Sequence, residues 1–259
     1  MNIAILGAGA MAGFVVQNCS DRGILLTHQI VRPGKQGANA GILQVSSVAD
    51  LPKETSLLVE CAGHQGLAQH GPEALWRGID VLTVSIGALA DQSLLDRLET
   101  AAREGGATLQ LASGALGALD VLRAAAIGGL DHVSYRGRKP PAGWRGSPAE
   151  KVLDLDKPLA KATTHFSGTA REAALAYPKN ANVAAAVALA GAGLDETTVE
   201  LIADPVAVGN THEVEASGAF GTMTFQVTGK GLPENPRTSA LAAMSVVSAI
   251  IDRQRRVRF

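Results

Sequence analysis

The sequence predicts an α/β fold class, with an N-terminal doubly wound parallel sheet followed by an α+β second domain whose sheet is mainly antiparallel. Three observations predict this. The chain opens with a strand, a glycine-rich turn and a helix; strands and helices then alternate to about residue 112; and short alternating strands dominate from residue 113. With 259 residues, 46% hydrophobic and 18% charged, the chain has enough apolar material for both cores.

The first domain is expected over residues 1–112. Apolar, partly β-branched runs bounded by turn residues predict its strands, and the longer runs between them predict its helices. The expected strands are 2–6, 25–31, 57–60, 81–85 and 108–111, and the expected helices are 10–20, 67–76 and 93–104. Because strand and helix alternate, the strands should be parallel and joined by right-handed crossovers.

The second domain is expected over residues 113–236. Its predicted strands are 132–136, 163–167, 197–203, 212–216 and 221–228, with helices at 117–126 and 183–190. Several of these strands alternate polar and apolar residues, which favours an antiparallel sheet with one face toward solvent. The segment 237–259 contains an apolar helix that we expect to pack back on the first domain.

Composition excludes several classes of function. The formal net charge is −1 and aromatic residues are 3% of the chain, so neither a nucleic-acid nor a membrane partner is expected. The two cysteines and scattered histidines have no metal-ligand spacing, so no metal is expected. An apolar start without a basic segment favours a cytoplasmic protein rather than a secreted one. A small polar metabolite is the expected substrate.

Residues 7–12, Gly-Ala-Gly-Ala-Met-Ala, fit the pattern G-x-G-x-x-G/A directly between a predicted strand and a predicted helix. Gly7 permits the tight turn, Gly9 lets backbone amides approach a pyrophosphate at the helix N-terminus, and Ala12 allows the helix to pack closely. This is the context of a Rossmann-type NAD or NADP site, although a ligand-free glycine turn is the alternative. The candidate cofactor-binding residues here are Gly7, Gly9, Ala10 and Met11.

The residues after the second predicted strand bear on the choice between NAD and NADP. An NAD-preferring site usually carries an acid there to hold the ribose 2′-hydroxyl, but this chain has Arg32 and Lys35 instead. Two cations suit a 2′-phosphate, so we expect NADP to be tolerated. The alternative is that both are exposed turn residues.

Several segments in order resemble the L-aspartate dehydrogenase family over nearly the whole chain. They are the glycine turn and residues 60–64 (ECAGH), 113–117 (SGALG), 137–140 (GRKP), 177–183 (YPKNANV), 203–205 (ADP) and 210–212 (NTH). The basic turn at Arg32 departs from the acid of a strict NAD enzyme.

The resemblance implies reversible, NAD(P)-dependent oxidation of L-aspartate to iminosuccinate, which hydrolyses to oxaloacetate and ammonia or feeds NAD biosynthesis. It also implies a homodimer whose second domain binds substrate and dimerises. Matched by position, Ala115 and Asn182 correspond to cofactor contacts and His212 to the catalytic histidine. Two alternatives remain: an oxidoreductase of the homoserine dehydrogenase or dihydrodipicolinate reductase type, and a non-catalytic NAD(P)-binding sensor.

Amino-acid oxidation needs a base and at least one cationic anchor for carboxylates. Histidine suits the base because its ordinary pKa is near neutrality. His212 is the first candidate, and His64, which follows the third predicted strand at the ligand-binding edge of the sheet, is the second.

The candidate substrate-binding residues besides His64 are Lys179, Asn180 and Arg138. Lys179 lies in a Pro-Lys-Asn-x-Asn turn before a predicted helix, where Asn180 or Asn182 would otherwise simply cap the helix. Arg138 belongs to a basic run, with Arg136 and Lys139, that could bind a dicarboxylate or merely be solvated.

Overall fold

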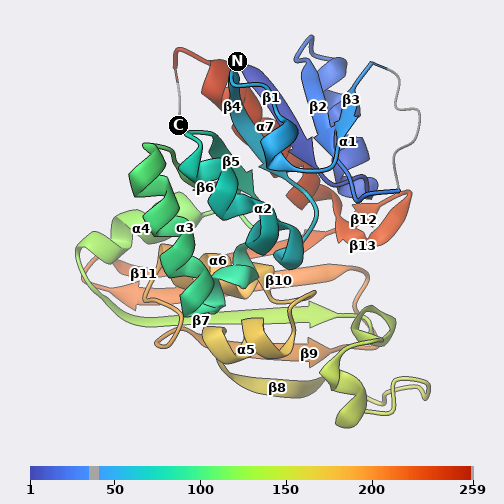
Figure 1. Ribbon diagram of the computed structural model, residues 1–259. Coiled ribbons are helices and arrows are strands. Elements are labelled where there is room, and N and C mark those ends of the chain that lie inside the picture. The colour runs from blue at the N-terminus through green and yellow to red at the C-terminus, as the bar shows by residue number, and fades with distance from the viewer. Residues whose placement is uncertain (35–40, 258–259) are drawn as a thin grey trace. The chain divides into compact units, whose positions relative to one another are not determined.

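The computed structural model describes residues 1–34 and 41–257, and the side chains of 236 and 237 are not among what it describes. The chain forms two compact units (Figure 1). The first comprises residues 1–112 together with 242–259, and the second comprises residues 113–241.

The first unit is built on a six-stranded, all-parallel sheet in the order β3-β2-β1-β4-β5-β6. Its strands are β1 Asn2–Leu6, β2 Leu26–Ile30, β3 Leu43–Val45, β4 Thr55–Glu60, β5 Asp80–Thr83 and β6 Leu109–Leu111. Its helices are α1 Ala10–Ser20, α2 His64–Trp76, α3 Gln92–Gly105 and most of α7 Ala240–Gln254, with short 3-10 turns at Val48–Asp50 and Ile86–Ala90. The three-residue β3 was not predicted because it is too short to show a pattern.

Helices cover both faces of this sheet. Ile3 and Ile5 of β1 pack with buried residues of α1 and α7, whereas Ala4 and Leu6 pack with those of α2 and α3. The alternation follows from the pleat, which sends successive side chains to opposite faces. A salt bridge also holds α7 on this sheet, because the Arg253 guanidinium lies 2.7 Å from the Asp80 carboxylate of β5.

The second unit contains a five-stranded sheet in the order β11-β10-β7-β9-β8, antiparallel except for the β7–β9 pair. The strands are β7 Leu130–Lys139, β8 Thr163–Thr169, β9 Thr198–Ala203, β10 Asn210–Gly218 and β11 Gly221–Gly229, followed by the two-stranded ribbon β12 Gly231–Leu232 and β13 Asn235–Ser239. The helices are α4 Leu119–Ile127, α5 Ala170–Ala176 and α6 Asn182–Ala190, and 3-10 turns occur at Pro141–Trp144 and Pro148–Lys151. The predicted fold class is confirmed.

The two faces of the second sheet differ in polarity. Helices α5 and α6 pack on the face that carries buried residues such as Val133 and Val214. On the other face Arg136 forms ion pairs of 2.8–3.0 Å with Glu200, Glu213 and Glu215 of the neighbouring strands. One face of the sheet is therefore part of the core. On the other face, glutamates of neighbouring strands compensate the charge of Arg136.

Some local expectations were wrong. Helix α2 begins at His64, three residues earlier than predicted, and helix α5 was not predicted although Thr169 and Glu172 form a capping box at its start. Neither Asn180 nor Asn182 caps α6, because its N-cap is Ala181 and no side chain bonds there. The side chain of Asn180 is engaged elsewhere in the unit.

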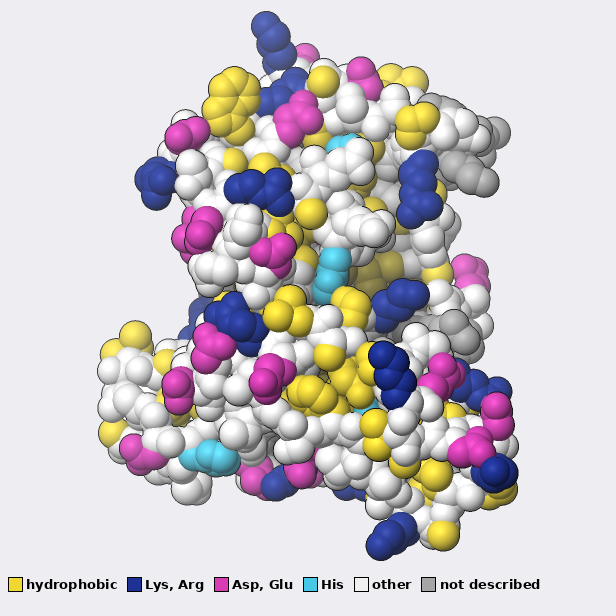
Figure 2. Space-filling view, turned by 60° about the horizontal axis from the view of Figure 1, so that its bottom comes forward, with side chains coloured by type: hydrophobic (Ala, Val, Ile, Leu, Met, Phe, Trp, Pro, Cys, Tyr) yellow, Lys and Arg dark blue, Asp and Glu magenta, His cyan; other side chains and the backbone are white. Residues whose placement is uncertain are grey.

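The described surface shows no segregation of charge by sign on the face in view. Figure 2 shows acidic and basic side chains interspersed over that face, in keeping with a formal net charge of −1. Among the described helices, none is both long and apolar enough to cross a membrane.

Candidate functional site

The glycine turn of the first unit follows β1. The strand order of the sheet reverses between β1 and β4, so the turn lies at the topological switch point. Gly7 has φ +107°, and a Cβ there would lie 3.0 Å from the carbonyl oxygen of Cys61. Gly9 caps α1 without a side-chain acceptor, and a Cβ at Gly9 would meet nothing within 4 Å. The open helix N-terminus at a switch point of a parallel sheet fits a pyrophosphate.

Glu60 holds the turn that faces Gly7. Its buried carboxylate accepts hydrogen bonds from the backbone amides of Ala62 and Gly63 at 2.6 and 2.7 Å and from the Thr83 hydroxyl at 2.6 Å. Burial raises the pKa of Glu60, and these hydrogen bonds oppose the rise. The carboxylate thereby fixes the backbone directly before His64, the partly buried first residue of α2.

The end of β2 carries no acid among the described residues 29–34. The Gln29 side chain is buried and donates to the carbonyl oxygen of Gly7 at 2.9 Å. Arg32 follows and is exposed, whereas Lys35 lies outside the described residues. The described part of this turn thus presents one cation to solvent.

In the second unit, His212 lies within β10 rather than at its start, and it is buried opposite Gly137 of β7. Its Nδ1 lies 2.7 Å from the hydroxyl oxygen of Tyr135. Gly137 leaves the space for this contact, because a Cβ there would lie 2.8 Å from that hydroxyl. With Nδ1 engaged, Nε2 is the nitrogen left to exchange a proton with a ligand.

Lys139, the last residue of β7, supplies the charge of this region. Its partly buried ammonium donates to Asn180 Oδ1 at 2.8 Å and lies 4.8 Å from the centroid of the Trp144 ring. Burial lowers the pKa of Lys139 to about 8. Burial and then the charge of Lys139 lower the pKa of His212 to about 4, so the imidazole is neutral at physiological pH.

His165 of β8 is a second buried histidine in this region. Its Nδ1 lies 3.2 Å from the Tyr177 hydroxyl, and its ring packs edge-on against Trp144 with centroids 4.4 Å apart. Burial and the charge of Lys139 lower its pKa to about 4. Its Nε2 is buried without a hydrogen-bond partner among the described residues. A buried polar atom of this kind has a cost that a bound ligand can relieve.

The two cations that the sequence proposed as substrate-binding residues, Arg138 and Lys179, have different surroundings in the structure. Arg138 pairs with the Asp204 carboxylate at 2.9 Å, and Lys179 is exposed. Asn180 is the one of these candidates that contacts Lys139. Ala115 is buried in the turn after β6, and Asn182 is the first residue of α6.

We name as the Lys139 cluster the six residues that the contacts above link to one another and to His212, namely Tyr135, Lys139, Trp144, His165, Tyr177 and Asn180. Sequence reasoning singled out Asn180 and His212 and named Lys139 only within a basic run. The aromatic members and His165 were missed, because the segments around 135–144, 165 and 177–180 come together only in the folded unit. The spacing of Tyr135 and Lys139, four apart on one face of a strand, was the available signal.

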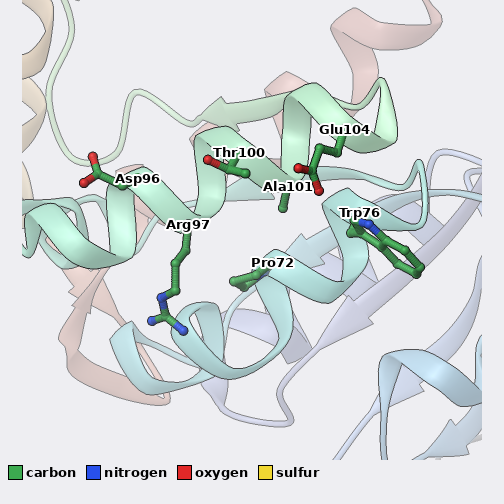
Figure 3. Close-up of a pocket in the computed structure, with 7 residues that line it drawn as sticks. All are labelled: Pro72, Trp76, Asp96, Arg97, Thr100, Ala101 and Glu104. Atoms are coloured by element: carbon green, nitrogen blue, oxygen red, sulfur yellow. The ribbon is translucent and has the colours of Figure 1, made fainter.

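A separate shallow pocket lies between α2 and α3 in the first unit (Figure 3). It is lined by Pro72, Trp76, Asp96, Arg97, Thr100, Ala101 and Glu104. It lies toward the C-terminal ends of both helices, whereas the glycine turn faces the start of α2 at His64. No candidate site residue lines it. Among residues 1–34 and 41–257, no three His, Cys, Asp or Glu side chains gather as a metal site.

Comparisons with known proteins agree over the whole chain. A family model described as "Aspartate dehydrogenase, C-terminal" matches residues 120–253, and one described as "Homoserine dehydrogenase, NAD binding domain" matches residues 7–112. An L-aspartate dehydrogenase of Ruegeria pomeroyi is 56% identical over 261 residues, covering 100% of this chain and 94% of that protein. One of Pseudomonas aeruginosa is 46% identical, covering 96% of each.

Among solved structures, an aspartate dehydrogenase from Thermotoga maritima matches with a TM-score of 0.78 at 23% identity, covering 100% of this chain and 99% of that one. At 23% identity, that likeness shows a shared fold. The family is shown by the sequence relatives, which are 56% and 46% identical. The chain belongs to the L-aspartate dehydrogenase family.

Proposed function

We propose that the protein is an NAD(P)-dependent L-aspartate dehydrogenase. It oxidises L-aspartate to iminosuccinate while NAD(P)⁺ is reduced to NAD(P)H and a proton is released; water then adds to the imine and releases oxaloacetate and ammonia. The observation that carries the proposal is 56% identity to an L-aspartate dehydrogenase along the entire chain. The glycine turn, whose residues fit a dinucleotide, and the buried His212 support it.

The chain's own residues have distinct tasks in this reaction. The backbone at Gly7, Gly9, Ala10 and Met11 would hold the pyrophosphate of the dinucleotide, which would supply the acceptor for a hydride from the substrate Cα. His212 takes the proton of the substrate amine through Nε2, because Tyr135 occupies Nδ1 and orients the ring. A neutral imidazole is the form that can accept this proton.

Further contacts complete the proposed site. Ala115 and Asn182 contact the cofactor in the second unit, and His64 contacts cofactor or substrate beside the glycine turn. Asn180, with Lys179 and Arg138, belongs to the substrate side. Arg138 has the least support among these residues, because its guanidinium already pairs with Asp204.

The cofactor is NAD or NADP, and we propose that NADP is used about as efficiently as NAD. The support is the exposed Arg32, two residues after the end of β2, where no described acid competes for the ribose. A guanidinium is suited to a 2′-phosphate through charge-assisted hydrogen bonds.

The deciding experiment follows the absorbance of reduced nicotinamide with purified protein, L-aspartate and either NAD or NADP at mildly alkaline pH. We expect reduction with L-aspartate and much less with L-glutamate, L-malate or L-homoserine. A folded protein that binds NAD(P)H yet reduces nothing would be the sensor, and preference for another substrate would place it with the related oxidoreductases.

A cytoplasmic homodimer is part of the same proposal. Its support is the family resemblance together with two cysteines that form no disulfide. Light scattering coupled to size exclusion measures the mass of the assembly, and a mass near twice 26.6 kDa is the expected value.

A further inference from the structure

Lys139 is a partly buried cation that forms no ion pair with the described residues. Among the described residues its ammonium has one hydrogen-bond acceptor, the neutral Asn180 side chain, and one aromatic face, Trp144. No ion pair joins it to a carboxylate among the described residues. Because removing a charge from water is costly unless an opposite charge compensates, this arrangement is unfavourable in the ligand-free protein.

The neighbouring arginines are different. Arg136 has three glutamate partners and Arg138 has Asp204. A substrate carboxylate that approached either arginine would compete with protein carboxylates already in place. Lys139 has ammonium protons not used by Asn180, so a carboxylate can bind there without displacing an anion.

The surroundings of Lys139 are also those of a ligand site. Its charge acts on both His165 and His212, so it lies within electrostatic reach of the proposed base. The buried Nε2 of His165 is a second polar group there, and it has no hydrogen-bond partner in the part of the chain that the structure describes. The aromatic rings of Trp144 and Tyr177 keep the region poorly solvated, which strengthens a charge–charge contact.

We propose that Lys139, oriented by Asn180, binds one carboxylate of the dicarboxylate substrate and brings it to His212. This inference rests on the proposed function and assigns its cationic anchor to Lys139 instead of Lys179 or Arg138. Binding has a second consequence, because a carboxylate on Lys139 offsets the positive charge that acts on His212. The imidazole then becomes a stronger base when substrate is bound.

The test compares Lys139→Met with the wild type, with the exposed Lys161→Met as the matched control and Lys179→Met as the rival anchor. Succinate, a dicarboxylate without an amino group, is titrated calorimetrically into the protein saturated with NADH. We expect Lys139→Met to weaken succinate binding and raise the KM for L-aspartate by about 10- to 100-fold, the range for a charged hydrogen bond. NADH affinity should change by no more than a few fold.

A melting experiment separates a binding role from a structural one. Since the Lys139 charge is uncompensated in the ligand-free protein, Lys139→Met should melt at the same temperature or higher, and succinate should no longer raise its Tm. A Tm that falls, with succinate affinity and KM unchanged, would make Lys139 a structural residue. Loss of succinate binding in Lys179→Met instead would move the anchor there.

The pKa of His212, followed by NMR of its imidazole, gives an independent measurement. The groups that face it are Lys139 and Tyr135 from β7, and its pKa should rise in Lys139→Met because the positive charge is gone. An unchanged pKa contradicts the coupling. If the wild type bound succinate through Lys139 but did not oxidise L-aspartate, the proposed function would fail while the binding site remained.

Discussion

Glu60 in the first unit and Lys139 in the second are both ionisable groups withdrawn from water beside a candidate site, but their surroundings differ. The Glu60 carboxylate accepts two backbone amides and the Thr83 hydroxyl, so its hydrogen-bonding capacity is largely used. The Lys139 ammonium has a single acceptor within residues 1–34 and 41–257, and that acceptor is neutral. A buried charge whose hydrogen bonds are satisfied maintains a structure, whereas one with unused hydrogen-bonding capacity is suited to receive a ligand.

The same contrast separates the two sites as a whole. The first unit presents backbone amides and glycines that follow one another along the chain, and its buried carboxylate holds them in place. The second unit presents side chains from strands and turns that are far apart in sequence. We therefore expect substitutions in the second unit to act on chemistry, and those in the first to act on stability and cofactor binding.

The largest expected effect is on turnover in the second unit. His212→Asn should lower kcat by about 10²- to 10⁴-fold, the usual contribution of a general acid–base, and lower kcat/KM in parallel. NAD(P)H binding, measured by fluorescence on the same preparation, should stay within a few fold. Near wild-type turnover would transfer the base to another residue, with His64 the next candidate.

Acid should destabilise the second unit through its two buried histidines. His212 and His165 have pKa values of about 4 in the folded protein, whereas an unfolded histidine titrates near 6.5. Between these values the unfolded chain binds protons that the folded one does not, so stability falls as pH drops from about 6.5 to 4. Both histidines contribute to this fall, and the more deeply buried His212 contributes on the order of 3 kcal/mol.

Urea unfolding at a series of pH values measures this effect. His165→Asn should flatten the acid slope, while substitution of the exposed His132 should leave it unchanged. An acid slope that is identical in all three proteins would show that these histidines titrate normally in the folded state.

In the first unit, Glu60→Gln should cost about 2 kcal/mol of stability. Glutamine accepts through one oxygen only, so its amide nitrogen would face a donor that the carboxylate now satisfies. We also expect weaker NAD(P)H binding, because Ala62 and Gly63 lose the group that fixes the turn against Gly7. The exposed Glu54→Gln is the control, and equal melting of the two variants would contradict this role.

The smallest effect concerns the choice of cofactor. Arg32→Asp should disfavour NADP relative to NAD by about 1 kcal/mol, at the low end for a charged hydrogen bond because Arg32 is exposed and its charge is screened. The ratio of kcat/KM for the two cofactors measures it. An unchanged ratio would show that Arg32 takes no part in the choice.

The sequence by itself determined the fold class and the candidate cofactor turn. Residues 2–12 form a strand, a turn and a helix whose signals are contiguous, and Gly7 is required where the backbone approaches Cys61. The resemblance singled out His212. These conclusions depend on local patterns, which a chain reveals without its tertiary structure.

Only the tertiary structure decided which cation remains without a carboxylate. Arg136, Arg138 and Lys139 are nearly adjacent in sequence, yet the strand pairing brings acids from β9 and β10 to Arg136, and Asp204 to Arg138. Lys139 points to the face that carries His212 and Trp144. Whether a charge is compensated depends on partners 40 to 80 residues away, and no local pattern encodes that distance.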